Sequence, residues 1–290
     1  MRIPVIDGDW WTIAHNPDLG RYGALEQETT SFGLWQAADG TWQLWGCIRR
    51  TAIGGKGRLF FRWEGTDITD TDWSPKGIAL TAEPNYGETP GGLQSPFAAR
   101  IKGEYLMVYG DWEHICMAKG SDGKIFERRL NRNNKTGMFD EGLGNGSRDP
   151  MIMVADGTYH VYYTANPGGR GAIYCRTSQD LRAWGDSRIV STGGRAGRNW
   201  DDAEVPMVVF LPQEKACYLF RTHSSNGRYT TSVYRSPDPL DFGIDSDRFL
   251  VATLPVEAAR ILKEGDQYYI AGVRPDHGGY QVARLKWIHK

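Results

Sequence analysis

The sequence lacks several features that would place it in common protein classes. It has no apolar run of membrane-spanning length, and its N-terminal segment MRIPVIDGDWW lacks the apolar core of a secretory signal. The formal net charge of -1 over 290 residues argues against a nucleic acid or an anionic membrane as a partner. Helix-period stretches are scarce, and no Gly/Ser linker or charge run divides the chain. These absences leave a β-rich chain without an obvious internal boundary.

Cysteine is also scarce. The four cysteines, Cys47, Cys116, Cys175 and Cys217, lie inside predicted strands and lack the spacing of metal ligands. Buried free thiols are therefore expected, which suits a cytoplasmic protein. A secreted or periplasmic chain from which a signal peptide had been removed would look the same. We expect no cofactor and no metal ligand set, with a structural metal ion on an axis as an open alternative.

A strand-and-turn pattern recurs five times along the chain. Its copies alternate aromatic or β-branched residues with other residues at a period of two, as half-buried strands require. They are TWQLWGCIRRT from Thr41, EYLMVYGDW from Glu104, TYHVYYTAN from Thr158, ACYLFRTHS from Ala216 and QYYIAGVRP from Gln267. A recurrence every 50 to 65 residues or so is roughly that of propeller blades.

A second strand follows each copy. In the four internal copies it runs into a polar turn and then an aromatic residue that can cover the gap between neighbouring sheets: Trp73, Phe126, Trp184 and Phe242. The last copy, from Tyr280, has no such ending, as expected if it closes a ring with residues near the N-terminus. Because one blade cannot bury both faces of its sheet, the sequence predicts an all-β, five-bladed β-propeller of four-stranded sheets, with residues 1–290 as a single domain.

The innermost strand of each blade begins near the axis of a propeller, so polar residues there converge on one pocket. The corresponding segments are QETTSFGLWQ, GGLQSPFAAR, NGSRDPMIMV, WDDAEVPMVV and PVEAARILKE. The third supplies Asp149 and the fourth Glu204, at positions that the repeats indicate are equivalent. Two carboxylates that face one cavity from separate blades are what acid/base hydrolysis of a glycosidic bond requires.

These residues carry a family resemblance. The segments SRDPMIMVADGTYHVYYTA, CRTSQDLRAWGDSRIV, AEVPMVV and CYLFRT resemble the five-bladed glycoside hydrolases of families 43 and 32 and their relatives, over essentially the whole chain. The resemblance implies an Asp on the first blade as general base, an Asp before Pro on the third as orienter and pKa modulator, and a Glu on the fourth as general acid. Asp149 matches the modulator and Glu204 matches the acid.

The first blade departs from that pattern. Alignment of its Thr-Ser-Phe-Gly-Leu-Trp with the Arg-Asp-Pro-Met-Ile-Met of the third blade places Ser31 where the family has its basic Asp. A serine cannot deprotonate water at neutral pH without a partner base. Three interpretations are open: another carboxylate acts as the base, the chain binds carbohydrate without hydrolysis, or the mechanism differs. The candidate carboxylates are, in order, Glu28, Asp111, Glu26 and Asp18.

Other residues near the predicted axis are candidates for binding a sugar through hydrogen bonds or stacking. They are Ser31, Trp35, Arg49, Gln94, Trp112, His114, Arg148, Arg221 and His223. Arg148 directly precedes Asp149, and we expect it to lower the pKa of that carboxyl and keep it ionised. Long Gly/Asn-rich loops feed three innermost strands and are expected to wall the cavity into a pocket, which favours action on a chain end.

The sequence thus predicts a glycoside hydrolase that cleaves a terminal bond of an oligosaccharide or polysaccharide with inversion. Glu204 is the predicted acid, Asp149 tunes it, and Glu28 or Asp111 activates water. One alternative is a carbohydrate-binding propeller that has lost its base. Another is a transglycosylating or phosphorolytic relative, because Arg49, Arg50, Arg148 and Arg221 could form a cationic cluster.

Overall fold

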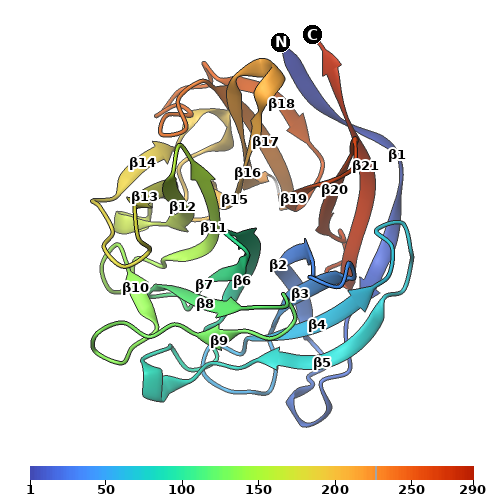
Figure 1. Ribbon diagram of the computed structural model, residues 1–290, viewed down its shortest axis with the longest axis vertical. Coiled ribbons are helices and arrows are strands. Elements are labelled where there is room, and N and C mark those ends of the chain that lie inside the picture. Colours follow the sequence, from blue (N-terminus) through green and yellow to red (C-terminus); the bar gives the residue numbers. More distant parts are fainter. Residues whose placement is uncertain (226) are drawn as a thin grey trace.

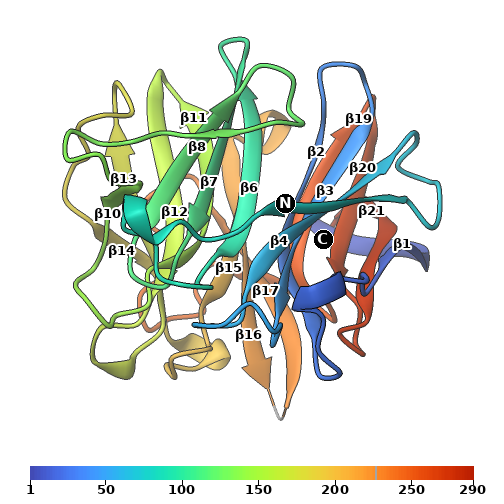
Figure 2. The same ribbon diagram turned by 90° about the horizontal axis from the view of Figure 1, so that it is seen from below.

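The computed structural model describes residues 1–225 and 227–290. Five antiparallel sheets stand around a central axis, as Figure 1 shows from above and Figure 2 from the side. The predicted five-bladed β-propeller is confirmed. In the first four blades the chain starts at the axis and moves outward, and in the fifth it does so until the N-terminal strand adds the outer edge. The innermost strands are β2 (Glu28–Gln36), β6 (Gln94–Ile101), β11 (Arg148–Ala155), β15 (Glu204–Leu211) and β19 (Glu257–Glu264).

The remaining strands complete the five blades. The first blade continues with β3 (Trp42–Arg49), β4 (Leu59–Gly65) and β5 (Ser74–Leu80), and the second with β7 (Glu104–Gly110), β8 (Ile115–Gly120), β9 (Glu127–Arg128) and β10 (Gly137–Phe139). The third continues with β12 (Thr158–Ala165), β13 (Ala172–Ser178) and β14 (Arg188–Ser191), and the fourth with β16 (Ala216–Ser225), β17 (Arg228–Ser236) and β18 (Leu250–Leu254). The fifth contains β20 (Gln267–Val273), β21 (Gly279–His289) and β1 (Arg2–His15).

Short single-turn helices occur only in connections within the described residues. They are η1 (Gly20–Tyr22), η2 (Pro84–Tyr86), η3 (Pro167–Gly169), η4 (Gly194–Ala196) and η5 (Pro212–Glu214). None of the described helices is long and apolar enough to cross a membrane.

The ring closes through its two chain ends. Strand β1 pairs antiparallel with β21, from Arg2 opposite His289 to His15 opposite Gly279, and the termini lie side by side in Figure 1. The predicted sharing of a blade between the C-terminal strand and an N-terminal segment is confirmed. The second blade departs from the four strands expected, because the connection after β8 folds back and pairs Glu127 and Arg128 with β8 before β10 forms.

The apolar core lies between neighbouring blades. Buried side chains form four clusters, and each joins the facing sheets of adjacent blades. The aromatic residues predicted to cover these gaps do so: Trp73, Phe126 and Phe242 are buried, and Trp184 is half-buried against Phe139. Each fully buried aromatic side chain contributes about 1.5–3 kcal/mol from the area it removes from water. All four cysteines are buried and free, as predicted.

Candidate active site

Each innermost strand is interrupted by a β-bulge at its start. The register shifts between Thr29 and Phe32 in β2, Gln94 and Phe97 in β6, Arg148 and Met151 in β11, Glu204 and Met207 in β15, and Glu257 and Arg260 in β19. In four of these bulges the first extra residue has a positive φ: Ser95 at 46°, Asp149 at 54°, Val205 at 48° and Ala258 at 54°. Such angles are costly for residues with a Cβ and occur where the surrounding structure imposes them. Bulges re-aim side chains, here toward the axis.

The bulges also correct the alignment of the repeats. Glu204 stands just before its bulge, at the position of Arg148, whereas Asp149 is the first residue inside its own bulge. The prediction that Asp149 and Glu204 occupy equivalent positions is therefore wrong by one residue. In the first blade the residue that matches Asp149 is Thr30 rather than Ser31. Neither Thr30 nor Ser31 has a carboxyl group, so the first blade lacks the expected basic Asp at both positions.

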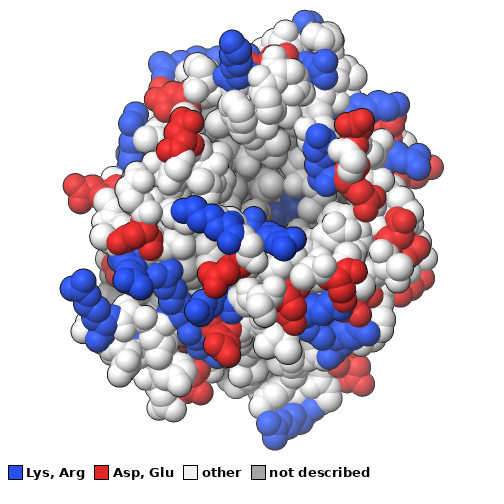
Figure 3. Space-filling view, viewed as in Figure 1, with Lys and Arg blue, Asp and Glu red and all other residues white. Residues whose placement is uncertain are grey.

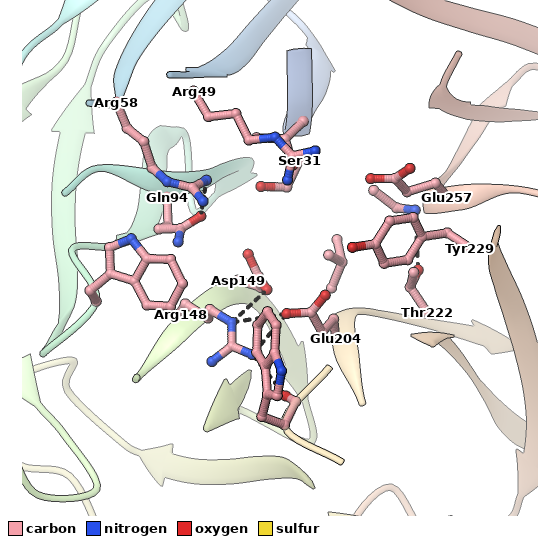
Figure 4. Close-up of a pocket in the computed structure, with 15 residues that line it drawn as sticks. Ser31, Arg49, Arg58, Gln94, Arg148, Asp149, Glu204, Thr222, Tyr229 and Glu257 are labelled. Carbon is pink, nitrogen blue, oxygen red and sulfur yellow. Dashed lines mark hydrogen bonds and ion pairs between the residues drawn. The ribbon is translucent and has the colours of Figure 1, made fainter. Parts of the chain in front are cut away.

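A cavity lies on the axis and is lined by residues from all five blades; its empty space, including open solvent at the mouth, is about 490 Å³. It is drawn in Figure 4, and Figure 3 shows a hollow near the centre of the ring. The lining residues are Thr30, Ser31, Arg49, Arg58, Gln94, Trp112, Arg148, Asp149, Trp200, Glu204, Val205, Thr222, Tyr229, Glu257 and Ala258. Polar and aromatic side chains that meet at such a volume are typical of a ligand site.

Three carboxyl groups line the cavity, one each from the third, fourth and fifth blades. Burial raises the pKa of Glu204 to about 7 and that of Glu257 to about 8. Neighbouring charges add to both shifts: the charge of Asp149 raises the pKa of Glu204, and the charge of Glu204 raises the pKa of Glu257. In Figure 4, Glu204 lies between Asp149 on one side and Glu257 and Tyr229 on the other. A carboxyl group with a pKa near neutrality can carry a proton to or from a substrate.

Arg148 connects Asp149 to Glu204. Its Nε and Nη2 donate to Oε1 of Glu204 at 3.1 and 2.8 Å, and its Nε lies 3.6 Å from Oδ2 of Asp149. The charge of Arg148 lowers the pKa of Asp149, as expected, but it does not bring that pKa below its ordinary value. Burial raises the pKa of Asp149 and outweighs the opposing charges of Arg148, Arg260 and Arg58. The stronger contacts of Arg148 are with Glu204.

Arg260 of β19 is fully buried and is not among the residues that line the cavity. It donates to the carbonyl of Phe32 at 2.8 Å, to the carbonyl of Pro206 at 3.2 Å and to Oγ of Ser95 at 3.0 Å. Those three partners belong to β2, β15 and β6, so one side chain of β19 ties the innermost strands of four blades together. Its charge also opposes the rise in the pKa of Asp149.

Seven of the thirteen site residues predicted from the sequence line this cavity. They are Glu204, Asp149, Ser31, Arg49, Gln94, Trp112 and Arg148. The other six lie outside its lining: Glu28, Trp35, Asp111, His114, Arg221 and His223.

The two carboxylates predicted as the base are occupied by structural contacts. Both oxygens of Glu28 are bound, one by Arg49 at 2.8 Å and the other by Arg50 at 2.7 Å, at the edge of the cavity. Asp111 is fully buried, and its oxygens accept from the backbone N–H groups of Thr89, Glu113 and His114. Asp111 therefore holds a turn, as Asp side chains commonly do.

The other four predicted residues outside the cavity lining also make contacts that support the fold. Trp35 packs between blades and donates from Nε1 to the carbonyl of Gly123 at 2.8 Å. The ring of His114 contacts Asp111, and this hydrogen bond raises the pKa of His114. Nε2 of His223 contacts Ser232 at 3.0 Å, and burial lowers its pKa.

Arg221 supports a loop that contributes a residue to the cavity wall. It is fully buried and donates to the carbonyls of Asp202 and Gly193 and to Oγ of Ser191. These contacts hold the loop that carries Trp200 against the fourth blade.

Several residues that line the cavity are not among the site residues predicted from the sequence, chiefly Glu257, Arg58 and Tyr229. The repeat pattern does indicate Glu257, because Glu257 stands directly before the bulge of its strand, at the position that Gln94, Arg148 and Glu204 occupy in theirs. Proline follows two residues after each of those three, but not after Glu257. Arg58 and Tyr229 come from outer parts of their blades, where no local pattern indicates the axis. Among the described residues no group of three or more His, Cys, Asp or Glu is placed to share a metal ion.

The fold and the cavity define a class: a five-bladed propeller with a carboxyl-lined pocket on its axis. Comparison with solved structures finds this fold in glycoside hydrolases. A thermostable family-43 glycoside hydrolase matches with a TM-score of 0.67 at 18% identity, over 92% of this chain and 91% of the other. An endo-arabinase from Bacteroides thetaiotaomicron matches with a TM-score of 0.68 at 11% identity, over 91% of this chain and 95% of the other.

A family-32 β-fructofuranosidase from Bombyx mori matches with a TM-score of 0.59 at 14% identity, over 95% of this chain and 60% of the other. At these identities the likeness shows the fold, and the resemblance to propellers of families 43 and 32 is confirmed at that level. No family model matches the chain, and none of the curated proteins does.

Proposed function

We propose that the protein is a glycoside hydrolase that cleaves a terminal glycosidic bond of an oligosaccharide or polysaccharide. The observation that carries the proposal is the group of Glu204, Glu257 and Asp149 around one axial cavity, with two of the three pKa values raised into the neutral range. Hydrolysis of a glycosidic bond needs one carboxyl that gives a proton to the leaving oxygen and a second that acts as a base or nucleophile. The fold shared with known glycoside hydrolases supports the same activity.

Glu204 is assigned as the general acid, in agreement with the resemblance noted in the sequence. Its pKa of about 7 leaves a large protonated fraction near neutral pH. Asp149, held beside Arg148, orients and tunes it.

Glu257 is assigned as the base that the first blade lacks. It is the remaining carboxyl among the residues that line the cavity, and Glu28 and Asp111 are committed to other contacts. Between pH 7 and 8, the range bounded by their two pKa values, Glu204 and Glu257 hold about one proton between them. Glu257 carries that proton in the major form, because its pKa is about one unit higher; in the minor form Glu204 carries it, and the charged Glu257 can then activate water.

The shape of the cavity supports action on a chain end. Loops next to the second and fourth blades place Trp112 and Trp200 at its wall. A cavity lined around the axis by side chains from all five blades favours a chain end over the middle of a polysaccharide. An acid and a base on different blades, with water between them, would invert the anomeric centre.

The binding alternative is favoured by one observation. Thr30 and Ser31 stand at the first-blade positions where the related propellers are expected to have their basic Asp. If Glu257 does not act as a base, the cavity would bind a saccharide without cleaving it.

The test of the proposed function uses a panel of nitrophenyl furanosides and pyranosides. Wild-type protein should hydrolyse at least one of them, and proton NMR of the first-formed sugar should show inversion. Glu204→Gln should lose about 10²–10⁴-fold on substrates with poor leaving groups while retaining activity on those whose leaving group needs no proton. Equal loss on both substrate types would remove Glu204 from the role of acid, and saccharide binding without any turnover would support the alternative.

A further inference from the structure

The arginines that line the cavity differ in how their donors are used. Arg148 commits all three of its nitrogens: Nε and Nη2 to Glu204, Nη1 to the carbonyl of Gly146 and to Asn166, and Nη2 also to the carbonyl of Trp200. Its side chain is 2% exposed. Arg148 is therefore part of the wall and has no donor left for a ligand.

Arg58 is in the opposite situation. Its Nη1 donates to Oε1 of Gln94 at 3.0 Å and lies 3.8 Å from Sγ of Cys47. In the part of the chain that the structure describes, no carboxylate pairs with Arg58, and its Nε and Nη2 make no hydrogen bond. A guanidinium group that lines a cavity without a counter-charge is uncommon, because desolvating it costs free energy that an ion pair would return.

Arg49 adds a second partly free guanidinium. Its Nε and Nη2 bind Glu28 at 2.8 and 2.7 Å, and its Nη1 makes no hydrogen bond within the described residues. Figure 4 shows Arg49 and Arg58 on the first-blade side of the cavity, with Arg58 across from Glu204 and Glu257. Arg49 lies nearer to Glu257, and its charge lowers the pKa of that carboxyl. Two guanidinium groups thus line the same cavity as the carboxyl groups.

The charges of the cavity and its immediate shell do not cancel. Arg148 is balanced by Asp149 and Glu204, and Glu28 is shared between Arg49 and Arg50. Arg58 and the buried Arg260 have no carboxylate in contact within the described residues, while Glu257 is protonated below its pKa of about 8. The site therefore carries an excess of positive charge at neutral pH, which favours an anionic ligand.

Trp112 fixes the position of Arg58. The Arg58 guanidinium lies 5.2 Å from the centre of the Trp112 ring, and Nζ of Lys56 lies 5.8 Å from it. Stacking on a tryptophan face restrains an arginine while leaving its edge free to donate two parallel hydrogen bonds. That edge matches the two oxygens of a carboxylate or a phosphate.

We infer that the cavity takes a ligand with an oxyanion group, which Arg58 binds with help from Arg49 beside the carboxyl groups. This inference rests on the part of the proposed function in which Glu204 protonates the leaving oxygen of a glycosidic bond, and it names the substrate class. The oxyanion has two possible sources: the carboxylate of a uronic acid residue at the end of a saccharide, or inorganic phosphate. Phosphate would replace water, with a phosphate oxygen forming the bond to the anomeric carbon as the glycosidic C–O bond breaks. Glu204 would give its proton to the leaving oxygen, the proton of the attacking hydrogen phosphate would return to Glu204, and the product would be a glycosyl phosphate.

Binding is measured by calorimetry in Glu204→Gln, so that the result does not depend on turnover. The probes are glucuronate and galacturonate, the neutral glucose and galactose, and inorganic phosphate. At least one anion should bind more tightly than the neutral sugars, with an affinity that falls as salt is added. Arg58→Gln, added to this background, should weaken that anion about 10–100-fold, the usual range for a hydrogen bond to a charged group. The matched control is Arg62→Gln, because Arg62 lies on β4, which begins directly after Arg58, but donates to the carbonyl of Lys124 and does not line the cavity.

The reaction product distinguishes the two sources of the oxyanion. Cleavage of a uronide by wild-type protein, with little on the neutral glycoside, would identify a uronic acid, whereas phosphate-dependent release of a glycosyl phosphate would identify phosphate. Equal affinity for anionic and neutral probes, or an anion affinity that Arg58→Gln leaves unchanged, would overturn the inference. Anion binding at Arg58 by a wild-type chain that cleaves nothing would overturn the proposed function alone. If Arg58→Gln fails to unfold cooperatively, the wild-type preference among the probes and Arg58→Lys decide the question.

Discussion

Replacement of Glu257 by Gln tests the proposed base through stability as well as through activity. The variant keeps the size of the side chain and removes its ionisation. Burial and the charge of Glu204 raise the pKa of Glu257 from 4.5 to about 8 in the folded protein. A carboxyl with a raised pKa stabilises the fold below its unfolded value and loses this contribution as pH rises through the folded value. The shift corresponds to an upper bound of about 5 kcal/mol between pH 4 and pH 9.

Chemical unfolding of wild type and Glu257→Gln at a series of pH values measures this effect. The variant should gain stability relative to wild type as pH rises from about 4.5 to above 8, by a few kcal/mol after the site relaxes. Glu104→Gln is the control, because Glu104 is exposed at the start of β7 and should show no such trend. A difference between wild type and Glu257→Gln that stays constant over this range would refute the buried, protonated state of Glu257.

The same variant should lose about 10²–10⁴-fold in turnover while still binding saccharide, and added azide should restore part of the loss. Substrates with good leaving groups should lose as much as those with poor ones, because a base acts on water and not on the leaving oxygen. If Glu257→Gln instead spares substrates with good leaving groups, Glu204 and Glu257 exchange their roles. The pKa values of about 7 and about 8 make that exchange chemically accessible, since a difference of one pKa unit amounts to about 1.4 kcal/mol.

Three further predictions concern the axis and the first blade. Arg260→Met should destabilise the protein by about 3–5 kcal/mol in denaturant unfolding, because it leaves carbonyl groups of two other blades and Ser95 without a donor; a loss below about 1 kcal/mol would mean that the blades do not depend on this contact. Trp112→Ala should raise KM about 10-fold or more through loss of sugar stacking and of the support for Arg58, and an unchanged KM would place the sugar elsewhere. Thr30→Asp, at the position that matches Asp149, should restore measurable turnover when it is added to the Glu257→Gln variant. Ser31→Asp in the same variant should restore less, and equal rescue by both substitutions would contradict the alignment of the bulges.

The propeller could be predicted from the sequence because its evidence is local and repeated. Alternating strands and the turns between them recur in each unit, and an aromatic residue such as Trp73 or Phe242 follows the second strand in four of them. Their apolar side chains are all buried only when neighbouring sheets pack face to face around a ring. The same local pattern placed Asp149 and Glu204 at the start of innermost strands, where the structure has them in one cavity.

What only the tertiary structure decided was which side chains face each other across the axis. Arg58 comes from an outer part of the first blade, and no spacing along the chain shows that it shares a cavity with Glu204. Glu257 stands at the repeat position of Glu204 but lacks the proline that follows two residues later in three other blades, and only the structure shows it at the cavity. The one-residue offset between Asp149 and Glu204 depends on bulges, which re-aim side chains without a sequence signal of their own. The raised pKa values follow from burial, which every blade contributes to and none of them determines alone.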